Sequence, residues 1–245
     1  MKLKGFWILW FSFLAPQLWA GGMVLIDPAK TPNLPPKYQG VKPFYIDQFE
    51  VTLGEQVSFK KKQIYKRVDE FQAKEAPDPA KPANLAPWYE AAHFCEVLGK
   101  RLPTALEWEL AAGVHRKYPW GDEPPNAKRG NFCDKSCKSP WNLWREQDGF
   151  ERSSPVGRFV EGATPEGVFD LAGNLWEWTS TIAETGETLI FRGKDQTALE
   201  NSQDLVIKGG SYGSRIEQLE NQAFARSPAN YKASYLGWRC VKDTL

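Results

Sequence analysis

The sequence has few of the residues that build metal centres and nucleophile–base pairs. Its 245 residues include 2 His, at positions 93 and 115, and 4 Cys. A structural zinc site needs four ligands and neither histidine has finger spacing, so zinc is not expected. The sequence also lacks an excess of either charge, with 31 basic and 30 acidic residues. We therefore expect no nucleic-acid partner, and the one basic run, at 60–67, is interpreted as a solvated helix face.

The N-terminal apolar run is too short to cross a bilayer. This run, residues 6–14, follows Lys2 and Lys4 and precedes Pro16 and Ala20. The order is typical of a secretory signal peptide, so residues 1–20 are predicted to be removed. The mature protein is then expected to be periplasmic or secreted, monomeric and without a membrane partner.

The four cysteines are expected to form disulfides, because export places them in an oxidising compartment. Three pairings are open to four cysteines. Cys133 and Cys137 are near enough in sequence to close a small loop, which leaves Cys95 to pair with Cys240. Zinc is the competing interpretation of the C-x3-C pair, but it has too few further ligands.

Apolar and aromatic residues are plentiful, at 42% and 13%, with 11 Trp. This composition, with Pro-rich loops and no internal repeat, predicts a single compact loop-rich α+β domain. The domain is placed at 44–245, after a Pro-rich N-terminal segment at 21–43.

Local patterns predict the first regular elements. Residues 44–51 alternate like a strand with one buried face. Thr-x-x-Glu capping boxes predict helices from Thr52 to about residue 61 and from Thr104 to Gly113. A further helix is predicted between Pro87 and Gly99. Phe94 and Trp108 lie on helix faces and are expected in the core, whereas His93 is expected at the surface or at the boundary of the core.

A Gly-x-Ser-x-Gly sequence at 209–213 has the context of a serine-hydrolase nucleophile elbow. It follows a predicted strand, "DLVI", and precedes a predicted helix, "SRIEQLENQAFA". However, those hydrolases place the general base after the serine, and no histidine follows position 115. Ser211 therefore has no partner to take its proton, and hydrolysis is not expected.

Six ordered motifs carry a resemblance to one family: "WYEAAHFCEVLGKRLPTALEWELAA", "YPWGDEPPNAKRGNFC", "DGFERSSPVGRF", "GVFDLAGNLWEWTS", "IKGGSYGS" and "ARSPANYKASYLGWRC". They resemble the successive signatures of the formylglycine-generating enzymes, also called sulfatase-modifying factors. The resemblance covers residues 44 to 242. It implies a single domain low in regular secondary structure, related to the C-type lectin fold and stabilised by calcium.

The resemblance implies a first calcium site in "DLAGNLWEW". Asp170 and Glu177 would supply carboxylates, and Gly173 and Leu175 backbone carbonyls. The chemistry agrees, because calcium takes six to eight hard oxygen ligands. The alternative interpretation is that Asp170 and Asn174 only form a turn and that Glu177 is a solvated strand residue.

The resemblance implies a second calcium site in "GNFC" and "QDGF". Asn131 and Asp148 would bind through their side chains, and Phe132 and Phe150 through their carbonyls. Asp148 is followed by glycine, which is also an ordinary turn sequence.

The chain differs from the family's pattern at the positions that the resemblance would assign to the catalytic copper. Formylglycine generation, as the family is understood, needs copper held by two cysteines after "GGSY". The first position falls on Ser214 and the second on Gln218 or Leu219. Neither a hydroxyl nor an amide holds Cu(I) as a thiolate does, so copper is not expected.

The resemblance also implies other positions in and around the pocket. Cys95 and Cys240 match a structural disulfide of the family, whereas Ala112 and Ala223 replace both partners of another. The candidate pocket residues are Trp176, Ser211, Ser214, Arg215 and Glu217.

Two functions follow as hypotheses. The first is a non-redox binding or accessory protein, a pseudoenzyme whose loop-lined groove takes a peptide, protein or glycan ligand. The alternative is an enzyme of another reaction in the superfamily, such as a maturation enzyme or oxidoreductase of the pyoverdine-maturation type. Genuine formylglycine generation is the least favoured.

Overall fold

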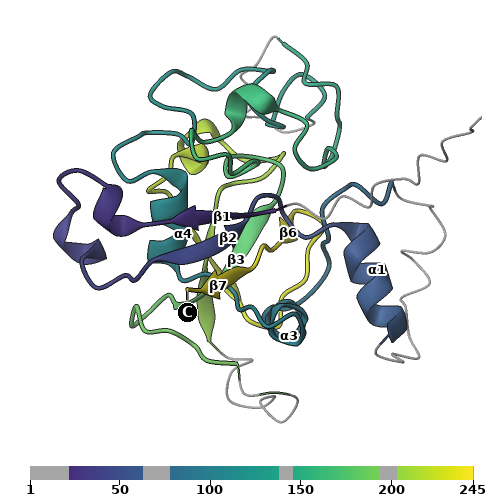
Figure 1. Cartoon of the computed structure of the whole chain (residues 1–245). Coiled ribbons are helices and arrows are strands. Elements are labelled where there is room, and N and C mark those ends of the chain that lie inside the picture. The colour runs from purple at the N-terminus through teal and green to yellow at the C-terminus, as the bar shows by residue number, and fades with distance from the viewer. Residues whose placement is uncertain (1–21, 63–77, 138–145, 192, 194–202, 245) are drawn as a thin grey trace, which may run out of the picture.

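The computed structural model describes residues 22–62, 78–137, 146–191, 193 and 203–244 (Figure 1). The predicted signal peptide and residues 63–67 of the basic run lie outside them. Within the described residues the helices are α1 (Leu53–Lys62), α3 (Trp88–Val97) and α4 (Ala105–Ala112). No helix in these ranges is long and apolar enough to cross a membrane.

Short strands form two small sheets. Their bounds are β1 (Met23–Ile26), β2 (Phe44–Asp47), β3 (Trp176–Ile182), β4 (Asp204–Lys208), β5 (Ala225–Pro228), β6 (Leu236–Gly237) and β7 (Val241–Asp243). One sheet has the order β1-β2-β7 and the other β5-β4-β3-β6. All pairs are antiparallel except β3 with β6. Few helices, short strands and long loops confirm the compact α+β class.

The predicted capping boxes are confirmed at both helices. Thr52 and Glu55 exchange backbone-to-side-chain hydrogen bonds of 2.8 and 3.2 Å at the start of α1, and Thr104 and Glu107 do the same at α4. Each pair satisfies donors that a helix leaves free at its first turn. The strand predicted at 44–51 ends earlier, at Asp47, where β2 stops pairing with β1.

Tryptophans fill the larger core, where α3 packs over the four-stranded sheet. Trp88, Trp178 and Trp238 are each at most 1% exposed. The Trp88 indole donates to the Thr179 carbonyl at 3.0 Å, and the Trp178 indole to Ala86 at 3.1 Å. Burying the Trp88 and Trp178 rings is favourable because the polar edge of each finds an acceptor.

A second core lies under α4 and the three-stranded sheet. Trp108 packs there with Phe44 and Ile46 of β2 and with Tyr38. Phe94 and Trp108 are buried as predicted, and His93 lies at the core boundary. The segment before β2 contributes β1 and two 3-10 turns, η1 (Pro28–Lys30) and η2 (Pro36–Tyr38).

Both predicted disulfides are confirmed. Cys95 of α3 is bonded to Cys240, next to β7, with Cα atoms 5.7 Å apart. Cys133 is bonded to Cys137, with Cα atoms 5.0 Å apart. The first joins residues 145 positions apart and so fixes α3 against the C-terminal strand.

The helix predicted in "SRIEQLENQAFA" is wrong. The chain forms only a 3-10 turn, η5 (Ile216–Leu219), and then enters β5, which pairs with β4. The Asn221 side-chain amide explains the break, because it donates to the carbonyls of Ala112, Gly113 and Arg116 at 2.9–3.0 Å. These bonds hold the segment in a non-helical path against the end of α4.

Candidate functional site

The candidate pocket is built on a tight turn after β4. Gly209 and Gly210 have positive φ angles of 93° and 72°, and a Cβ on Gly210 would lie 2.8 Å from the Leu219 side chain. Ser211 and Ser214 close the turn: the Ser211 N–H donates to Ser214 Oγ at 2.9 Å, and the Ser214 N–H to the Ser211 carbonyl at 3.0 Å. The Ser214 hydroxyl is therefore occupied inside the turn.

The second candidate copper position is equally unsuited to a metal. Gln218 accepts a hydrogen bond from the Arg215 N–H at 3.0 Å. Leu219 is 1% exposed and packs with Tyr118 and Phe132. A hydroxyl and either an amide or an apolar side chain do not fit Cu(I), which binds soft sulfur ligands. All four cysteines are in disulfides, so none supplies a thiolate there.

The turn adjoins a group of tyrosines that the sequence did not indicate. Tyr231 and Tyr235 are 41% and 38% exposed, and their hydroxyls lie 2.8 Å apart. The Tyr212 hydroxyl lies 3.2 Å from Ser234 Oγ. The hydrogen bond with Tyr231, together with burial, raises the pKa of Tyr235 to about 12, so Tyr235 stays protonated at neutral pH.

Trp176 connects this tyrosine group to the core. It is the first residue of β3 and is 5% exposed. Its backbone N–H donates to the Tyr235 carbonyl at 2.9 Å. Ser211 is 4% exposed, whereas Arg215, which precedes η5, and Glu217, within η5, are exposed. The candidate residues thus divide into a buried group (Trp176, Ser211 and Ser214) and an exposed pair, and Tyr212 brings the tyrosine group next to Ser211.

The Trp-Glu-Trp triplet places Glu177 in the core against Arg239. Both side chains are fully buried, and their closest atoms are 2.7 Å apart. The Arg239 Nε also donates to Glu177 Oε2 at 2.8 Å, and the Trp108 indole donates to the same oxygen at 2.9 Å. A carboxylate between two tryptophans is tolerated because a guanidinium and an indole N–H satisfy it.

Two further carboxyl groups belong to the same buried cluster. Glu50 accepts from the Asn174 amide at 2.6 Å and from the Leu175 N–H at 3.2 Å. Asp170 accepts from the Gly157 N–H at 2.6 Å. Burial, with the nearby charges of Asp170 and Glu177, raises the pKa of Glu50 well above its usual value. Burial, with the charge of Glu177, raises the pKa of Asp170 to about 6.

This cluster is the first site implied for calcium. Its three carboxyl groups face one guanidinium, so full ionisation leaves uncompensated negative charge that a proton or a cation would relieve. The turn at residues 170–174 lies close to the second implied site, because a Cβ added to Gly173 would lie 2.3 Å from the Asn131 carbonyl oxygen. However, both Glu177 oxygens already bind Arg239 or Trp108, so an ion would have to share that carboxylate.

At the second implied site one buried side-chain oxygen is left without a partner among the described residues. Asn131 is 1% exposed, and its amide nitrogen donates to the Arg152 carbonyl at 2.8 Å and to Asn174 Oδ1 at 3.2 Å. Both partners are acceptors, which fixes the orientation of the amide. Among the described residues, Asn131 Oδ1 has no hydrogen-bond partner. A buried orphan oxygen is costly, and a cation would satisfy it.

Asp148 forms the acidic part of this second site. Its oxygens accept from the Phe132 N–H at 2.9 Å and the Phe150 N–H at 2.8 Å. Burial, with the nearby charge of Asp134, raises its pKa to about 6. Asp134 and Glu50 are the two acidic residues that sequence reasoning missed. Their only sequence signals are a charge inside the C-x3-C loop and a charge at an apolar position of "FYIDQFEV".

The arrangement of two small sheets, short helices and long ordered loops defines the class of protein. The solved structure of PvdO from Pseudomonas aeruginosa has the same fold, with a TM-score of 0.62 and 21% identity, covering 91% of this chain and 92% of that chain. The fold is thus a loop-rich α+β domain of the type related to C-type lectins.

Sequence comparison then gives the family. The sulfatase-modifying factor enzyme 1-like domain matches residues 17–244. The chain is 34% identical to the formylglycine-generating enzyme of Mus musculus over 169 residues, covering 64% of this chain and 43% of that protein. It is 38% identical to the inactive C-alpha-formylglycine-generating enzyme 2 of Bos taurus over 157 residues, covering 63% and 48%. The chain belongs to the formylglycine-generating enzyme family, and it spans about half the length of the curated relatives it matches.

Proposed function

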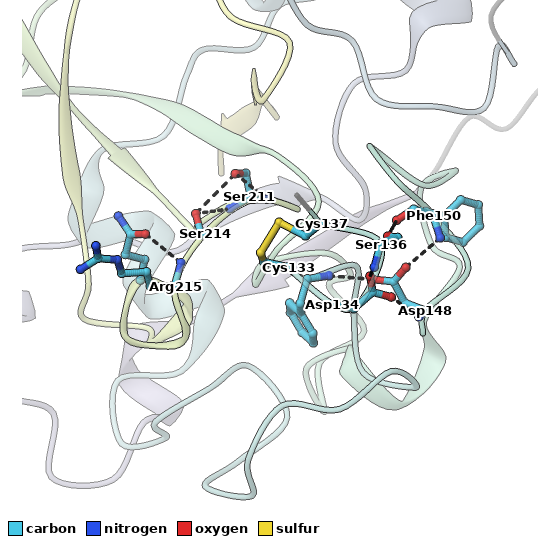
Figure 2. The surroundings of a disulfide bond; sticks show 12 residues. Cys133, Asp134, Ser136, Cys137, Asp148, Phe150, Ser211, Ser214 and Arg215 are labelled. Carbon is cyan, nitrogen blue, oxygen red and sulfur yellow. Dashed lines mark hydrogen bonds between the residues drawn. A yellow bond between two sulfur atoms is a disulfide. The ribbon is translucent and has the colours of Figure 1, made fainter. Parts of the chain in front are cut away.

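We propose that this protein is an exported, calcium-stabilised binding or accessory member of the family that does not convert cysteine to formylglycine. One observation carries the proposal: Ser214 stands where the first copper-binding thiol is expected, and Gln218 or Leu219 stands where the second is expected. The Ser214 hydroxyl accepts a hydrogen bond within its turn (Figure 2), Gln218 accepts one from the Arg215 N–H, and Leu219 is part of an apolar cluster. Without a sulfur pair the pocket has no means to hold Cu(I). The relative from Bos taurus that is named inactive supports the same interpretation.

The ligand surface is proposed to be the rim around Ser211. Tyr212, Tyr231 and Tyr235 carry hydroxyl groups in this region, and the Tyr235 carbonyl accepts a hydrogen bond from the Trp176 backbone N–H. Such side chains combine apolar contact with hydrogen bonding and lose little conformational entropy on binding. This chemistry suits a peptide, protein or glycan ligand.

Calcium is proposed at both implied sites. At the second site Asn131 Oδ1 and Asp148 would bind an ion with the Phe132 and Phe150 carbonyls. At the first, Asp170 and Glu177 would do so with the Gly173 and Leu175 carbonyls. The ion would supply positive charge to buried oxygens and tie together loops that have little regular structure. Two disulfides support export, because such bonds persist in oxidising compartments.

The alternative function is a maturation enzyme or oxidoreductase of the same superfamily, an option consistent with the fold shared with PvdO. The Ser211 hydroxyl and the exposed Arg215 and Glu217 would then contact the substrate. Loss of turnover in Ser211→Ala with ligand binding retained would favour this alternative.

A Cu(I)-binding assay under anaerobic conditions tests whether the copper site is missing. The protein competes for Cu(I) with the chelator bicinchoninate. The wild-type protein, with its disulfides intact, is expected to take no copper from the chelator. Ser214→Cys combined with either Gln218→Cys or Leu219→Cys gives two matched controls, and one of the two is expected to gain a copper ion. A wild-type protein that binds one equivalent as tightly as that variant would overturn the proposal.

A further inference from the structure

A pocket of about 150 Å³ lies between α3 and the chain that follows β3. Most of its wall is apolar. The apolar residues that line it are Trp88, Ala92, Leu102, Leu189, Ile190 and Phe191. Among the described residues, none of those that line the pocket belongs to the Ser211 turn or to either implied calcium site. The pocket is therefore separate from the site described above.

Two well-anchored elements form its opposite walls. Trp88, Ala92 and Glu96 follow one another at four-residue spacing on α3, so they lie on one face of the helix. The small side chain of Ala92 leaves room beside the Trp88 ring. The other wall is fixed to the end of β3, where the Leu189 N–H donates to the Ser180 carbonyl at 2.7 Å. Both walls thus depend on regular backbone hydrogen bonds.

Two aromatic rings give the pocket a defined shape. The Trp88 ring is buried, and its indole N–H donates to the Thr179 carbonyl at 3.0 Å, which fixes the plane of the ring. The Phe191 ring centroid lies 6.3 Å from that of Trp88, and the two planes are inclined at 66°. Aromatic pairs prefer edge-to-face and offset-stacked contacts. Two rings at this angle can offer a third ring both kinds of contact.

The charged side chains of the pocket do not favour a charged ligand. Lys100 Nζ lies 2.5 Å from Asp47 Oδ1, and Arg101 Nη2 lies 2.6 Å from Glu107 Oε1. The Glu96 side chain is 52% exposed and stays in water. A ligand carboxylate that entered the pocket would lose its hydration beside cations that are already paired, which is unfavourable. The lining therefore favours a neutral ligand.

The volume indicates the size of that ligand. Protein interiors are closely packed, so a space of this size forfeits dispersion contacts unless something fills it. An engineered apolar cavity of about the same volume binds benzene. Ile190 is 63% exposed, so the pocket reaches the protein surface and a ligand can enter without unfolding the domain.

We propose that this pocket is a second binding site, which takes the neutral six-membered ring of a small aromatic molecule. Trp88 and Phe191 contact the ring, and Ala92 and Leu189 set the space available to it. The inference does not depend on the proposed calcium sites, on the missing copper site or on the tyrosines near Ser211. Its failure would leave the proposed function as it stands.

Saturation-transfer NMR with toluene at pH 7.5 tests the proposal on the full mature protein. Toluene is expected to bind saturably. Benzoate has the same ring and a negative charge, and it is expected to bind about tenfold more weakly or not at all. N-acetylphenylalaninamide carries the ring on a peptide unit. It is expected to bind more weakly than toluene, and tighter binding would overturn the assignment to a small molecule in favour of a peptide side chain.

Two variants fill the pocket from opposite walls. Ala92→Leu on α3 and Leu189→Phe on the other wall are each expected to weaken toluene binding about tenfold or more, because the added atoms take the space of the ring. Val97→Leu adds one methylene at an exposed position of α3 outside the lining, and it is expected to bind as the wild type does. Far-UV circular dichroism checks the fold, and because the two substitutions lie on different elements, either one that folds suffices.

Two results would overturn the inference. The first is a wild-type protein that shows no saturable binding of toluene. The second is a filled variant that is folded and binds toluene as tightly as Val97→Leu does. Neither result bears on the copper and calcium assays, which test the proposed function separately.

Discussion

Replacing Arg239 by methionine tests the buried charge cluster at the centre of the fold. Arg239 is fully buried and makes two hydrogen bonds to Glu177, at 2.7 and 2.8 Å. Its Nη2 also donates to the Phe169 carbonyl at 2.9 Å. Methionine fills similar space without the charge, so Glu177 would remain buried beside Glu50 and Asp170 with no cation.

The expected loss in the free energy of unfolding is about 3–5 kcal/mol, the usual cost of leaving one member of a buried ion pair behind. For a domain of this size that corresponds to a fall of roughly 6–20 °C in the unfolding midpoint. The loss should be larger at pH 7.5 than at pH 5. Arg239 lowers the pKa values of Glu50 and Asp170, so its removal raises them further. A carboxyl whose folded-state pKa is raised loses its stabilising contribution as pH rises through that pKa.

Urea unfolding at both pH values, followed by circular dichroism, measures the effect. Arg101→Met is a suitable control, because Arg101 is 39% exposed and pairs with Glu107 and the exposed Asp243. The exposed Arg101–Asp243 pair contributes about 0–1 kcal/mol, and the Arg101 bonds to the buried Glu107 add to it, so the loss is expected to be smaller than at the fully buried Arg239. A loss for Arg239→Met no greater than that for Arg101→Met, or one that is independent of pH, would refute the reasoning.

Three other outcomes are expected. Removing the long-range disulfide by Cys95→Ala with Cys240→Ala should cost about 5 kcal/mol by loop entropy, measured by urea unfolding, and a loss below about 1 kcal/mol would contradict it. Trp108→Phe should cost about 1–3 kcal/mol, because the Glu177 oxygen loses its indole donor, and an unchanged urea midpoint would contradict that role. The rise in melting temperature caused by calcium should be largest above pH 7 and small at pH 5. The pKa of Asp148 is about 6, so below pH 6 protons compete with the ion for this carboxylate. Above pH 6 the ionised Asp148 repels the nearby Asp134, and calcium relieves that repulsion. A calcium effect that grows as pH falls from 7 to 5 would contradict this order.

Local signals predicted the helices and the disulfides well. The Thr104–Glu107 capping box is a short-range pattern, and its hydrogen bonds form within four residues. The pairing of Cys95 with Cys240 followed once the close pair was assigned. Local signals failed for the helix predicted after Ser214. The Asn221 side-chain amide donates to carbonyls more than 100 positions away in the sequence, and a local pattern does not show these contacts.

The sequence predicts features of the candidate site that depend on the identity of a residue, but not those that depend on which distant residue it contacts. The proposed absence of copper thiols follows from the side chains at Ser214 and at Gln218 or Leu219, and it stays a prediction. The pairing of Glu177 with Arg239 spans 62 positions and depends on the sheet that brings β3 beside the C-terminal segment. Glu50 and Asp134 were missed for the same reason, since nothing near them in sequence shows which carboxylates they face.

The central claim, an intact family scaffold without the oxidising centre, is tested most directly with a substrate peptide. Purified mature protein, copper and oxygen are incubated with a sulfatase-type peptide containing Cys-x-Pro-x-Arg, and the product is read by mass spectrometry. We expect the peptide cysteine to remain unchanged. Conversion of that cysteine to the aldehyde, at a rate that depends on copper and protein, would contradict the claim.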